Sequence, residues 1–183
     1  MNMQIFPTSL DGVLQIAPQV FGDERGYFYE SFNARTFAEL TGLHPDFVQD
    51  NHSRSMRHVL RGLHYQIRHP QGKLVRVTMG EVLDVVLDIR RSSPTFGKWQ
   101  SMRLSAQNKH QLWIPPGFAH GFAVLSEWAE VQYKTTDYWM PEHERCIAWN
   151  DPALGIDWEL DGPPSLSAKD QQGKPLAQAE VYP

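Results

Sequence analysis

The chain has 183 residues, of which 41% are hydrophobic and 21% are charged, and its formal net charge is −4 at pH 7. This composition is typical of a folded protein with one sizeable core, and we expect a single domain over residues 1–183. The acidic balance argues against a nucleic-acid partner held by general electrostatics. The apolar runs are shorter than the roughly 20 residues of a membrane-spanning helix, so no membrane association is expected.

The N-terminal stretch and the cysteine content both favour a cytoplasmic location. The opening stretch MNMQIFPTSLDG has neither the basic region nor the apolar run of a signal peptide. Cys146 is the single cysteine, so an internal disulfide is impossible and a reducing compartment is expected. It lies in the strand-like stretch ERCIAWND, where we expect a buried, inert thiol rather than a nucleophile.

In chain order, the predicted elements are mostly short strands between glycine and proline turn signals. A strand at 27–32 is followed by a helix at 34–42, with Asn33 as its N-cap and Gly42 at its end. Further strands are expected at 58–66, 73–80, 81–90, 99–105, 110–116, 120–126 and 129–136. Many short strands with almost no helix predict a mainly β fold, an antiparallel sandwich or barrel.

Basic residues gather just before and inside the strand at 58–66. The stretch NHSRSMRHVLR carries Arg54, Arg57 and Arg61 and runs directly into apolar residues, which makes it the candidate site for an anionic ligand. Within VLRGLHYQ, strict alternation places Arg61 and His64 on opposite faces. Gly62, between them, is where a bulge can redirect a side chain, and the sequence leaves open whether it does.

The strand EVLDVVLDIR has two faces of different character. One face carries four apolar residues, Leu83, Val85, Leu87 and Ile89, and is expected to face the core. The other carries Asp84 and Asp88 between valines. A buried Asp84 needs a cationic or hydrogen-bonding partner; the alternative for both acids is the protein surface.

Two histidines and a lysine lie on apolar strand faces, more than a packed core normally tolerates. They are His64, Lys73 at the start of KLVRV, and His120 in FAHGFAV. A metal-binding cupin uses an H-x-H pair, but this chain has H-Y-Q with Gln66 in the second position. Because a transition-metal site usually has three or four good ligands, we predict no metal here.

The remaining hypothesis is acid–base chemistry. The pKa of histidine suits His64 for a general base, and Asp84 or Asp170 is a candidate to orient its ring. Tyr133 is a candidate proton donor, with simple packing as the alternative. Lys73 would stabilise a developing enolate as an oxyanion-hole cation does.

Nine stretches of the chain resemble a known enzyme family, in order from about Ile5 to the C-terminus. They are VFGDERGYFYESFN, FVQDNHSRS, VLRGLHYQ, QGKLVRV, GEVLDVVLDIR, SPTFGKW, WIPPGFAHGF, YKTTDYW and LSAKD. The family is that of the dTDP-4-dehydrorhamnose 3,5-epimerases, the RmlC enzymes of dTDP-L-rhamnose synthesis. The resemblance implies a cupin-type jelly roll, a homodimer with strand exchange, no metal and no organic cofactor. It also implies inversion at C3 and C5 of a dTDP-linked 4-keto-6-deoxyhexose.

The resemblance further assigns roles to individual residues. It implies that His64 is the base, Asp170 its partner, Tyr133 the proton donor and Lys73 the cation near the C4 oxygen. Substrate contacts would fall on Arg25, Glu30, Gln49, Asp50, Asn51, Arg61, His120, Glu144 and Lys169. Strand exchange would bring Arg25 and Glu30 from the neighbouring subunit. The aromatic that stacks on thymine is usually a tyrosine, whereas that position here is Trp139, preceded by Tyr138.

Three other functions compete with this interpretation. Related enzymes invert C3 alone or move the ketone between C3 and C4 on the same scaffold. A metal-dependent cupin oxygenase or isomerase would contain stoichiometric metal. A non-catalytic sugar-binding barrel would bind the nucleotide sugar without exchanging its protons with solvent.

Overall fold

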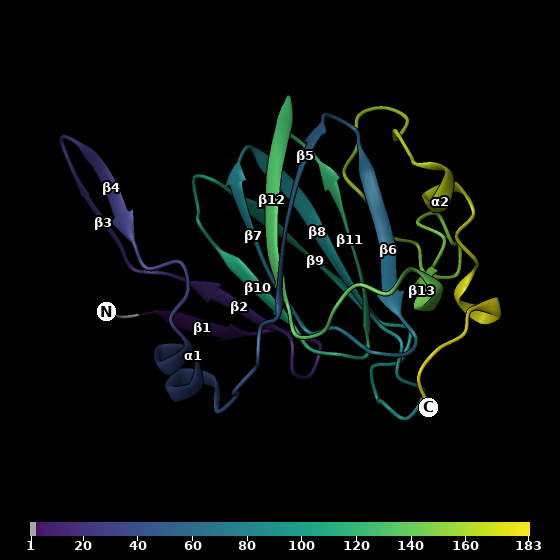
Figure 1. The fold of residues 1–183 in the computed structure, drawn as a ribbon. Coiled ribbons are helices and arrows are strands. Elements are labelled where there is room, and N and C mark those ends of the chain that lie inside the picture. Colours follow the sequence, from purple (N-terminus) through teal and green to yellow (C-terminus); the bar gives the residue numbers. More distant parts are fainter. Residues whose placement is uncertain (1–2) are drawn as a thin grey trace.

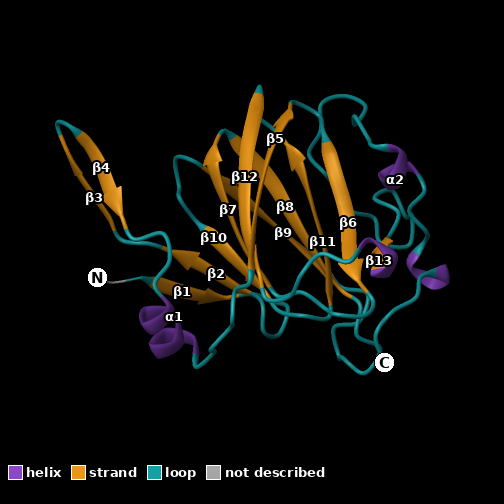
Figure 2. Cartoon of the chain, viewed as in Figure 1, coloured by secondary structure: helices purple, strands orange, loops and turns teal. Residues whose placement is uncertain are grey.

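Two antiparallel β-sheets pack against each other in the computed structural model, which describes residues 3–183 (Figures 1 and 2). The six-stranded sheet has the order β1-β2-β10-β7-β12-β5, and the five-stranded sheet has the order β13-β6-β11-β8-β9. Most strands that are adjacent in these sheets are not consecutive in sequence, as in a jelly roll. The predicted mainly β fold of cupin type is confirmed, with short helices at its periphery.

The elements have the following bounds. The strands are β1 (Gln4–Pro7), β2 (Leu14–Ala17), β3 (Val20–Asp23), β4 (Gly26–Tyr29), β5 (Gln49–Met56), β6 (Leu60–Gln66), β7 (Lys73–Met79), β8 (Glu81–Asp88), β9 (Trp99–Ser105), β10 (Gln111–Ile114), β11 (Phe118–Val124), β12 (Trp128–Thr135) and β13 (Glu144–Cys146). The helices are α1 (Ala34–Thr41), α2 (Ala168–Gln171) and the 3-10 turns η1 (Pro141–His143) and η2 (Leu176–Gln178). Within the described chain, no helix has the length and apolar character needed to cross a bilayer.

Helix α1 lies where the sequence predicts it, and its two ends have the predicted caps. The Asn33 side chain accepts a hydrogen bond from the Thr36 amide, and Gly42 ends the helix in the left-handed conformation at φ 71°. Phe37 is the buried residue of the helix and packs edge-on against Trp113 of β10, with ring centroids 5.7 Å apart. The helix thereby covers part of the outer face of the six-stranded sheet.

Two apolar layers flank the five-stranded sheet. The inner layer fills the space between the sheets and includes Val75, Val86 and Val131. The outer layer includes Leu83 and Val85, and apolar residues of the chain's own C-terminal segment pack over them. Strand β8 is therefore buried on both faces. The face that carries Leu83 and Val85 packs against the C-terminal segment, and the opposite face, with Val86, lies between the two sheets.

The two acidic residues of β8 lie inside the protein, so the alternative that they lie at the surface is wrong. Asp84 and Asp88 are both fully buried. Asp88 accepts hydrogen bonds from the side chains of Arg90, Ser93 and Thr95. Burial alone would raise the pKa of Asp88, but these donors outweigh it and lower the pKa to about 2. The surface alternative is wrong because the side of β8 that carries the acids faces the opposite sheet.

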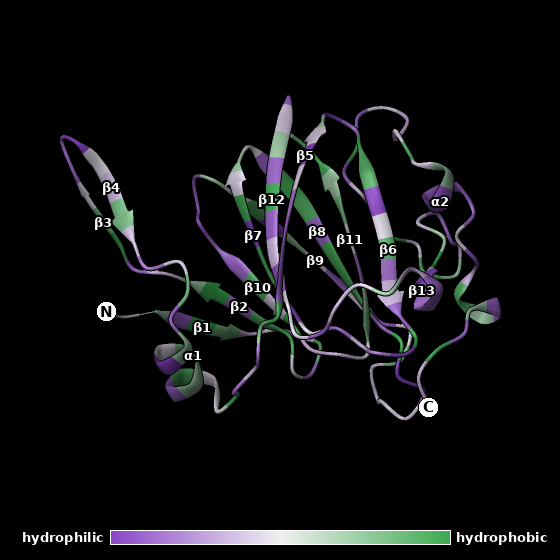
Figure 3. Cartoon of the chain, in the orientation of Figure 1, coloured by the Kyte–Doolittle hydropathy of each residue, from purple (hydrophilic) through white to green (hydrophobic). Residues whose placement is uncertain are grey.

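Strands β3 and β4 form a separate hairpin that projects from the body of the molecule (Figure 1). Its side chains Phe21, Tyr27 and Phe28 are exposed. The strand predicted at 27–32 ends earlier than expected, at Tyr29. Strands β1, β2, β3 and β5 were not predicted. The hydropathy colouring explains the omission of β5, which is largely hydrophilic (Figure 3).

Candidate active site

A cavity of about 310 Å³ opens between the two sheets and contains most of the predicted site residues. Ten of them line it: Gln49, Asn51, Arg61, His64, Lys73, His120, Tyr133, Trp139, Glu144 and Lys169. Sequence reasoning did not single out four more lining residues, Ser53, Gln71, Gly121 and Phe122. Strand parity gave a signal for Phe122, which shares its face with His120, whereas Ser53 lies on a strand that was not predicted.

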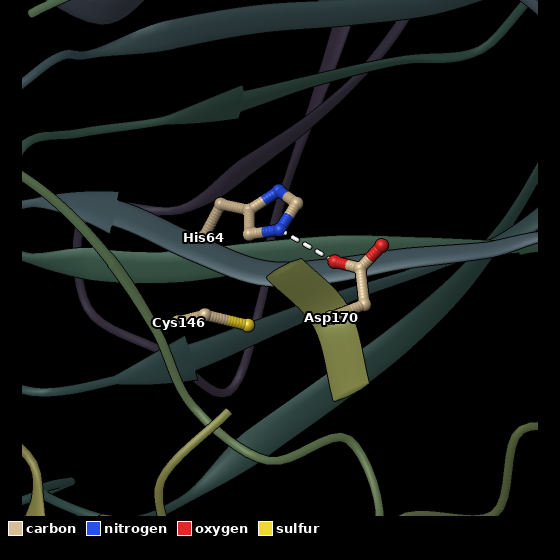
Figure 4. Close-up of side chains that lie close together, drawn as sticks. All are labelled: His64, Cys146 and Asp170. Carbon is tan, nitrogen blue, oxygen red and sulfur yellow. Dashed lines mark hydrogen bonds and ion pairs between the residues drawn. The ribbon is translucent and has the colours of Figure 1, made fainter. Parts of the chain in front are cut away.

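His64 and Asp170 form a hydrogen-bonded pair at one side of this cavity (Figure 4). The distance from His64 Nε2 to Asp170 Oδ1 is 2.6 Å. Because a carboxylate only accepts hydrogen bonds, Nε2 carries the proton and the Nδ1 lone pair is free to act as a base. Burial lowers the pKa of His64 and outweighs the opposing effect of Asp170, so the ring is neutral at pH 7.

Asp170 is held by the start of helix α2. Ser167 caps this helix, and its hydroxyl donates to Asp170 Oδ2 at 2.6 Å. The Gly62 amide donates to Asp170 Oδ1 at 3.1 Å. Burial would raise the pKa of Asp170, but the hydrogen bonds from His64, Ser167 and Gly62 hold it well below its ordinary value. The carboxylate therefore stays ionised and is hydrogen-bonded to the ring of His64, whereas Asp84 is hydrogen-bonded to His120.

A bulge in β6 allows Arg61 and His64 to face the same cavity. His120 of β11 pairs with His64, whereas Phe122 pairs with Arg61, so β6 contains one residue more than its partner over this stretch. Gly62 has φ +128°, and a Cβ there would lie 2.6 Å from the Gly121 Cα. Only glycine fits such a backbone contact and conformation. The sequence marked Gly62 as a possible bulge and left open whether one forms; the structure has it there.

Lys73 and Tyr133 approach the cavity from the six-stranded sheet. The Lys73 ammonium donates to the backbone carbonyl of His64 at 3.4 Å. Burial lowers the pKa of Lys73 to about 8, although Glu144 and Asp84 oppose this change. Burial raises the pKa of Tyr133, so its phenol keeps its proton at neutral pH. The cavity therefore has a neutral imidazole on one wall and a protonated phenol and an ammonium on the other.

The second histidine of the cavity has its own carboxylate. His120 Nε2 lies 2.8 Å and 3.0 Å from the two oxygens of Asp84, and both residues are buried. This is the partner that a buried Asp84 was expected to need. Lys169 and Glu144 also line the cavity and form an ion pair at 2.8 Å.

Four predicted substrate contacts lie outside this cavity in the single chain. Asp50 points from the outer face of the six-stranded sheet, where it forms an ion pair with Lys134 beside a second hollow of about 340 Å³. Arg25 is on the projecting hairpin and pairs with Asp23. Glu30 lies beside the base of that hairpin, and Tyr138 is exposed next to Trp139.

Cys146 lies beside the His64–Asp170 pair (Figure 4). One potential ligand atom of each of the three residues lies within 4.8 Å of the others. However, burial raises the pKa of the Cys146 thiol to about 12, so it is protonated and a poor ligand and nucleophile at neutral pH. The imidazole and carboxylate are already hydrogen-bonded to each other. These donor properties favour a histidine–carboxylate pair over a metal centre.

The fold and the cavity between its sheets place the protein in the class of cupin-type jelly rolls, and comparisons with known proteins identify its family. The family model for dTDP-4-dehydrorhamnose 3,5-epimerase matches residues 7–178. The chain therefore belongs to the dTDP-4-dehydrorhamnose 3,5-epimerase family. Its activity is that of the family: it is an isomerase of dTDP-rhamnose biosynthesis.

Individual relatives are similar over nearly the whole chain. The chain is 64% identical over 175 residues to dTDP-4-dehydrorhamnose 3,5-epimerase of Pseudomonas aeruginosa, which covers 96% of this chain and 97% of that protein. It is 56% identical over 178 residues to the enzyme of Salmonella typhimurium, with 97% of each chain covered. A crystal structure of the Legionella pneumophila enzyme in complex with dTDP-4-keto-L-rhamnose has a TM-score of 0.95 at 54% identity, covering 98% of this chain and 95% of that chain.

Proposed function

We propose that this cavity binds dTDP-4-dehydro-6-deoxy-D-glucose and inverts C3 and C5 by moving protons between two walls. A C–H bond next to a ketone is weakly acidic, and loss of its proton places negative charge on the C4 oxygen. His64 Nδ1 removes the proton at each centre while Asp170 holds the ring. Tyr133 returns a proton from the opposite face at C5, and water does so at C3.

The observation that carries this proposal is the placement of the acid and the base on different sheets. His64 belongs to β6 of the five-stranded sheet, and Tyr133 belongs to β12 of the six-stranded sheet. Both line the same cavity. Inversion needs groups on opposite faces of the sugar, because a single base would return the proton to the face from which it came. Facing sheets provide such groups.

Lys73 stabilises the enolate in this mechanism. Its ammonium is buried beside the backbone of His64, where few water molecules screen its charge. Asp84 and Glu144 favour its protonated form. A fixed cation close to the C4 oxygen lowers the energy of both enolates, as an oxyanion hole does for other anionic intermediates.

The nucleotide part of the substrate would occupy the cationic and aromatic residues around the cavity. Arg61 uses Nε to donate to Ser55 at 3.0 Å, which leaves the outer nitrogens of its guanidinium available for a diphosphate. Trp139 is 56% exposed at the cavity and offers its ring face for stacking on thymine. We propose His120, Lys169 and Glu144 as further substrate contacts.

Replacing His64 with asparagine tests the proposal directly. We expect turnover to fall by about 10²–10⁴-fold, the usual contribution of a general base. The affinity for dTDP should change little, because His64 contacts the sugar. In D₂O, proton NMR of the wild-type product should show deuterium at both C3 and C5. Wild-type turnover in the variant, or deuterium at C3 alone in the wild-type product, contradicts the mechanism.

We further infer a homodimer that exchanges the β3–β4 hairpin. An isolated two-stranded hairpin is marginally stable in water, and this one exposes Phe21, Tyr27 and Phe28. Docked on a second copy, the hairpin would bury these side chains and bring Arg25 and Glu30 to the partner's cavity. In this proposal the enzyme is a cytoplasmic homodimer, and each subunit is a single domain.

Mixing two inactive variants tests the exchange. Arg25→Ala alters the hairpin, and His64→Asn alters the cavity. In a mixed dimer, one cavity has both its own His64 and an intact hairpin from the partner. Random mixing should therefore restore about a quarter of the sites. No recovery, together with monomeric behaviour in sedimentation, would contradict the exchanged dimer.

A further inference from the structure

Strand β5 presents a row of polar side chains to the inside of the barrel. Ser53 pairs with Val131 of β12 in the strand register, and Val131 belongs to the inner core. Because side chains alternate along a strand, Asn51, Ser53 and Ser55 share this inward face. Ser53 lines the same cavity as His64 and Tyr133.

The neighbours of Ser53 in this row have hydrogen-bond partners, whereas Ser53 does not. Gln49 Nε2 donates to Asn51 Oδ1 at 2.9 Å, and Ser55 accepts from Arg61. Within residues 3–183, Ser53 Oγ and Trp113 Nε1 are the buried side-chain polar atoms without a partner. A buried hydroxyl without a partner is unfavourable. Rotation about one bond turns this oxygen between staggered positions, so it can take a partner inside the cavity.

Ser53 lies on the wall from which the protons must be returned. Tyr133 pairs with Asn51, so Ser53 is one step along the same inner face, diagonally next to Tyr133. His64 and His120 lie on the other sheet. The mechanism needs a donor on the Tyr133 side at two carbons, and one phenol serves C5. A serine side chain is shorter than that of tyrosine, and a water molecule bound to its hydroxyl would extend its reach into the cavity.

We propose that Ser53 is a positioning residue that holds the water which reprotonates C3. The inference rests on the mechanism proposed above. The C3–H bond breaks with its proton going to His64 and its electrons going to the C4 oxygen. The enolate then takes a proton from the water bound to Ser53 on the opposite face, which forms the new C3–H bond. The resulting hydroxide is neutralised by the proton that His64 releases through solvent, so the enzyme returns to its starting state.

Separate measurement of the two inversions tests the role of Ser53. The proton NMR signals of C3 and C5 are followed in D₂O for the wild type and for Ser53→Ala. We expect the rate of C3 inversion to fall by about tenfold or more. The rate of C5 inversion should stay within about threefold, so that the product inverted at C5 alone accumulates. Equal loss at both carbons, or no loss at C3, overturns the proposal.

A matched pair of variants separates the hydroxyl from the shape of the side chain. Ser53→Thr keeps the hydroxyl and Ser53→Val replaces it with a methyl group of similar size, and both residue types suit a strand. We expect the Thr variant to keep the wild-type ratio of the two rates and the Val variant to lose C3 inversion. If both variants behave alike, the hydroxyl has no such role. Ser55→Ala, which frees Arg61, should raise KM without changing the ratio.

The outcome of this experiment is distinct from a failure of the general mechanism. If His64 were not the base, His64→Asn would keep exchange at both carbons whatever happens at Ser53. If only the Ser53 assignment is wrong, wild-type protein exchanges at both carbons, His64→Asn does not, and Ser53→Ala resembles wild type.

Discussion

The five-stranded sheet is buried on both faces at its strands β8 and β11, whereas the outer face of the six-stranded sheet is exposed at its edge strand β5. Strand β8 of the first sheet is almost continuously buried, but β5 and β12 of the second alternate between more and less buried residues. The C-terminal segment causes this difference because it packs over the outer face of the five-stranded sheet. The same segment delivers Asp170 to His64.

The two sheets contribute groups of different protonation to the cavity. The His64 imidazole on the five-stranded sheet, the proposed base, is neutral, with its tautomer fixed by a buried carboxylate. The groups on the six-stranded sheet keep their protons, a phenol with a raised pKa and an ammonium. A base and an acid on facing sheets suit a reaction that inverts carbon centres.

The largest effect is expected from replacing Asp170, the carboxylate that is hydrogen-bonded to His64. Asp170→Asn replaces an acceptor-only group with an amide that can also donate, so His64 no longer has a fixed tautomer. We expect kcat to fall by about 10²–10⁴-fold, as for other bases that lose their orienting carboxylate. Steady-state kinetics measure this loss. Asp161→Asn on the same C-terminal segment is the control, because Asp161 lies at the surface with Arg57 and His58.

A change at Tyr133 should affect the rates of inversion at C5 and C3 differently. Tyr133→Phe removes the phenol hydroxyl and keeps the ring. We expect inversion at C5 to fall by about 10²-fold, with a smaller change at C3 and in the affinity for dTDP. Proton NMR of the product in D₂O distinguishes the two carbons. Full C5 inversion in this variant would remove Tyr133 from the mechanism.

Replacing Arg61 tests whether this residue of β6 binds the substrate diphosphate and takes no part in proton transfer. Removing a guanidinium that binds a diphosphate costs charge-assisted hydrogen bonds, so Arg61→Ala should raise KM by roughly 10–100-fold. The kcat should fall much less. Initial rates over a range of substrate concentrations separate the two parameters, and a large loss of kcat at unchanged KM would contradict a binding role.

The pH profile of kcat/KM should reflect one group from each wall. In the proposed mechanism His64 acts as the neutral imidazole. Burial lowers its pKa from the ordinary 6.5, so activity should fall with decreasing pH below that value as the ring protonates. Lys73 acts as the ammonium, so activity should fall with increasing pH through about 8. Each limb should change about tenfold per pH unit. In Lys73→Met the residual activity should lack the alkaline limb.

Apolar alternation in the sequence indicated three polar residues of the cavity, whereas Gln49, Asn51, Trp139, Glu144 and Lys169 were expected from the family resemblance alone. His120 shares its face with Phe118 and Phe122, and Lys73 shares its face with Val75. All three polar groups of this kind, including His64, line the cavity. Gly62 also gave a true signal, since a glycine between two polar residues in a strand indicates a bulge.

Other features had no such local signal. Strand β5 has polar residues on both faces, because its inner face lines a polar cavity instead of the core, so no alternation marks it. The pairing of His120 with Asp84, and of His64 with Asp170, joins residues 36 and 106 positions apart. Local patterns do not specify which of two acids meets which histidine.

By itself, the sequence determined the mainly β class, the capped helix α1 and the apolar strand faces that carry His64, Lys73 and His120, because these depend on alternation and turn chemistry within a few residues. The tertiary structure decided which carboxylate holds His64, which face of β8 is the inside of the barrel, and that Ser53 has an unpartnered hydroxyl toward the cavity. These depend on contacts between distant segments. Whether a buried polar group is satisfied is a property of its surroundings in space and not of its neighbours in the chain.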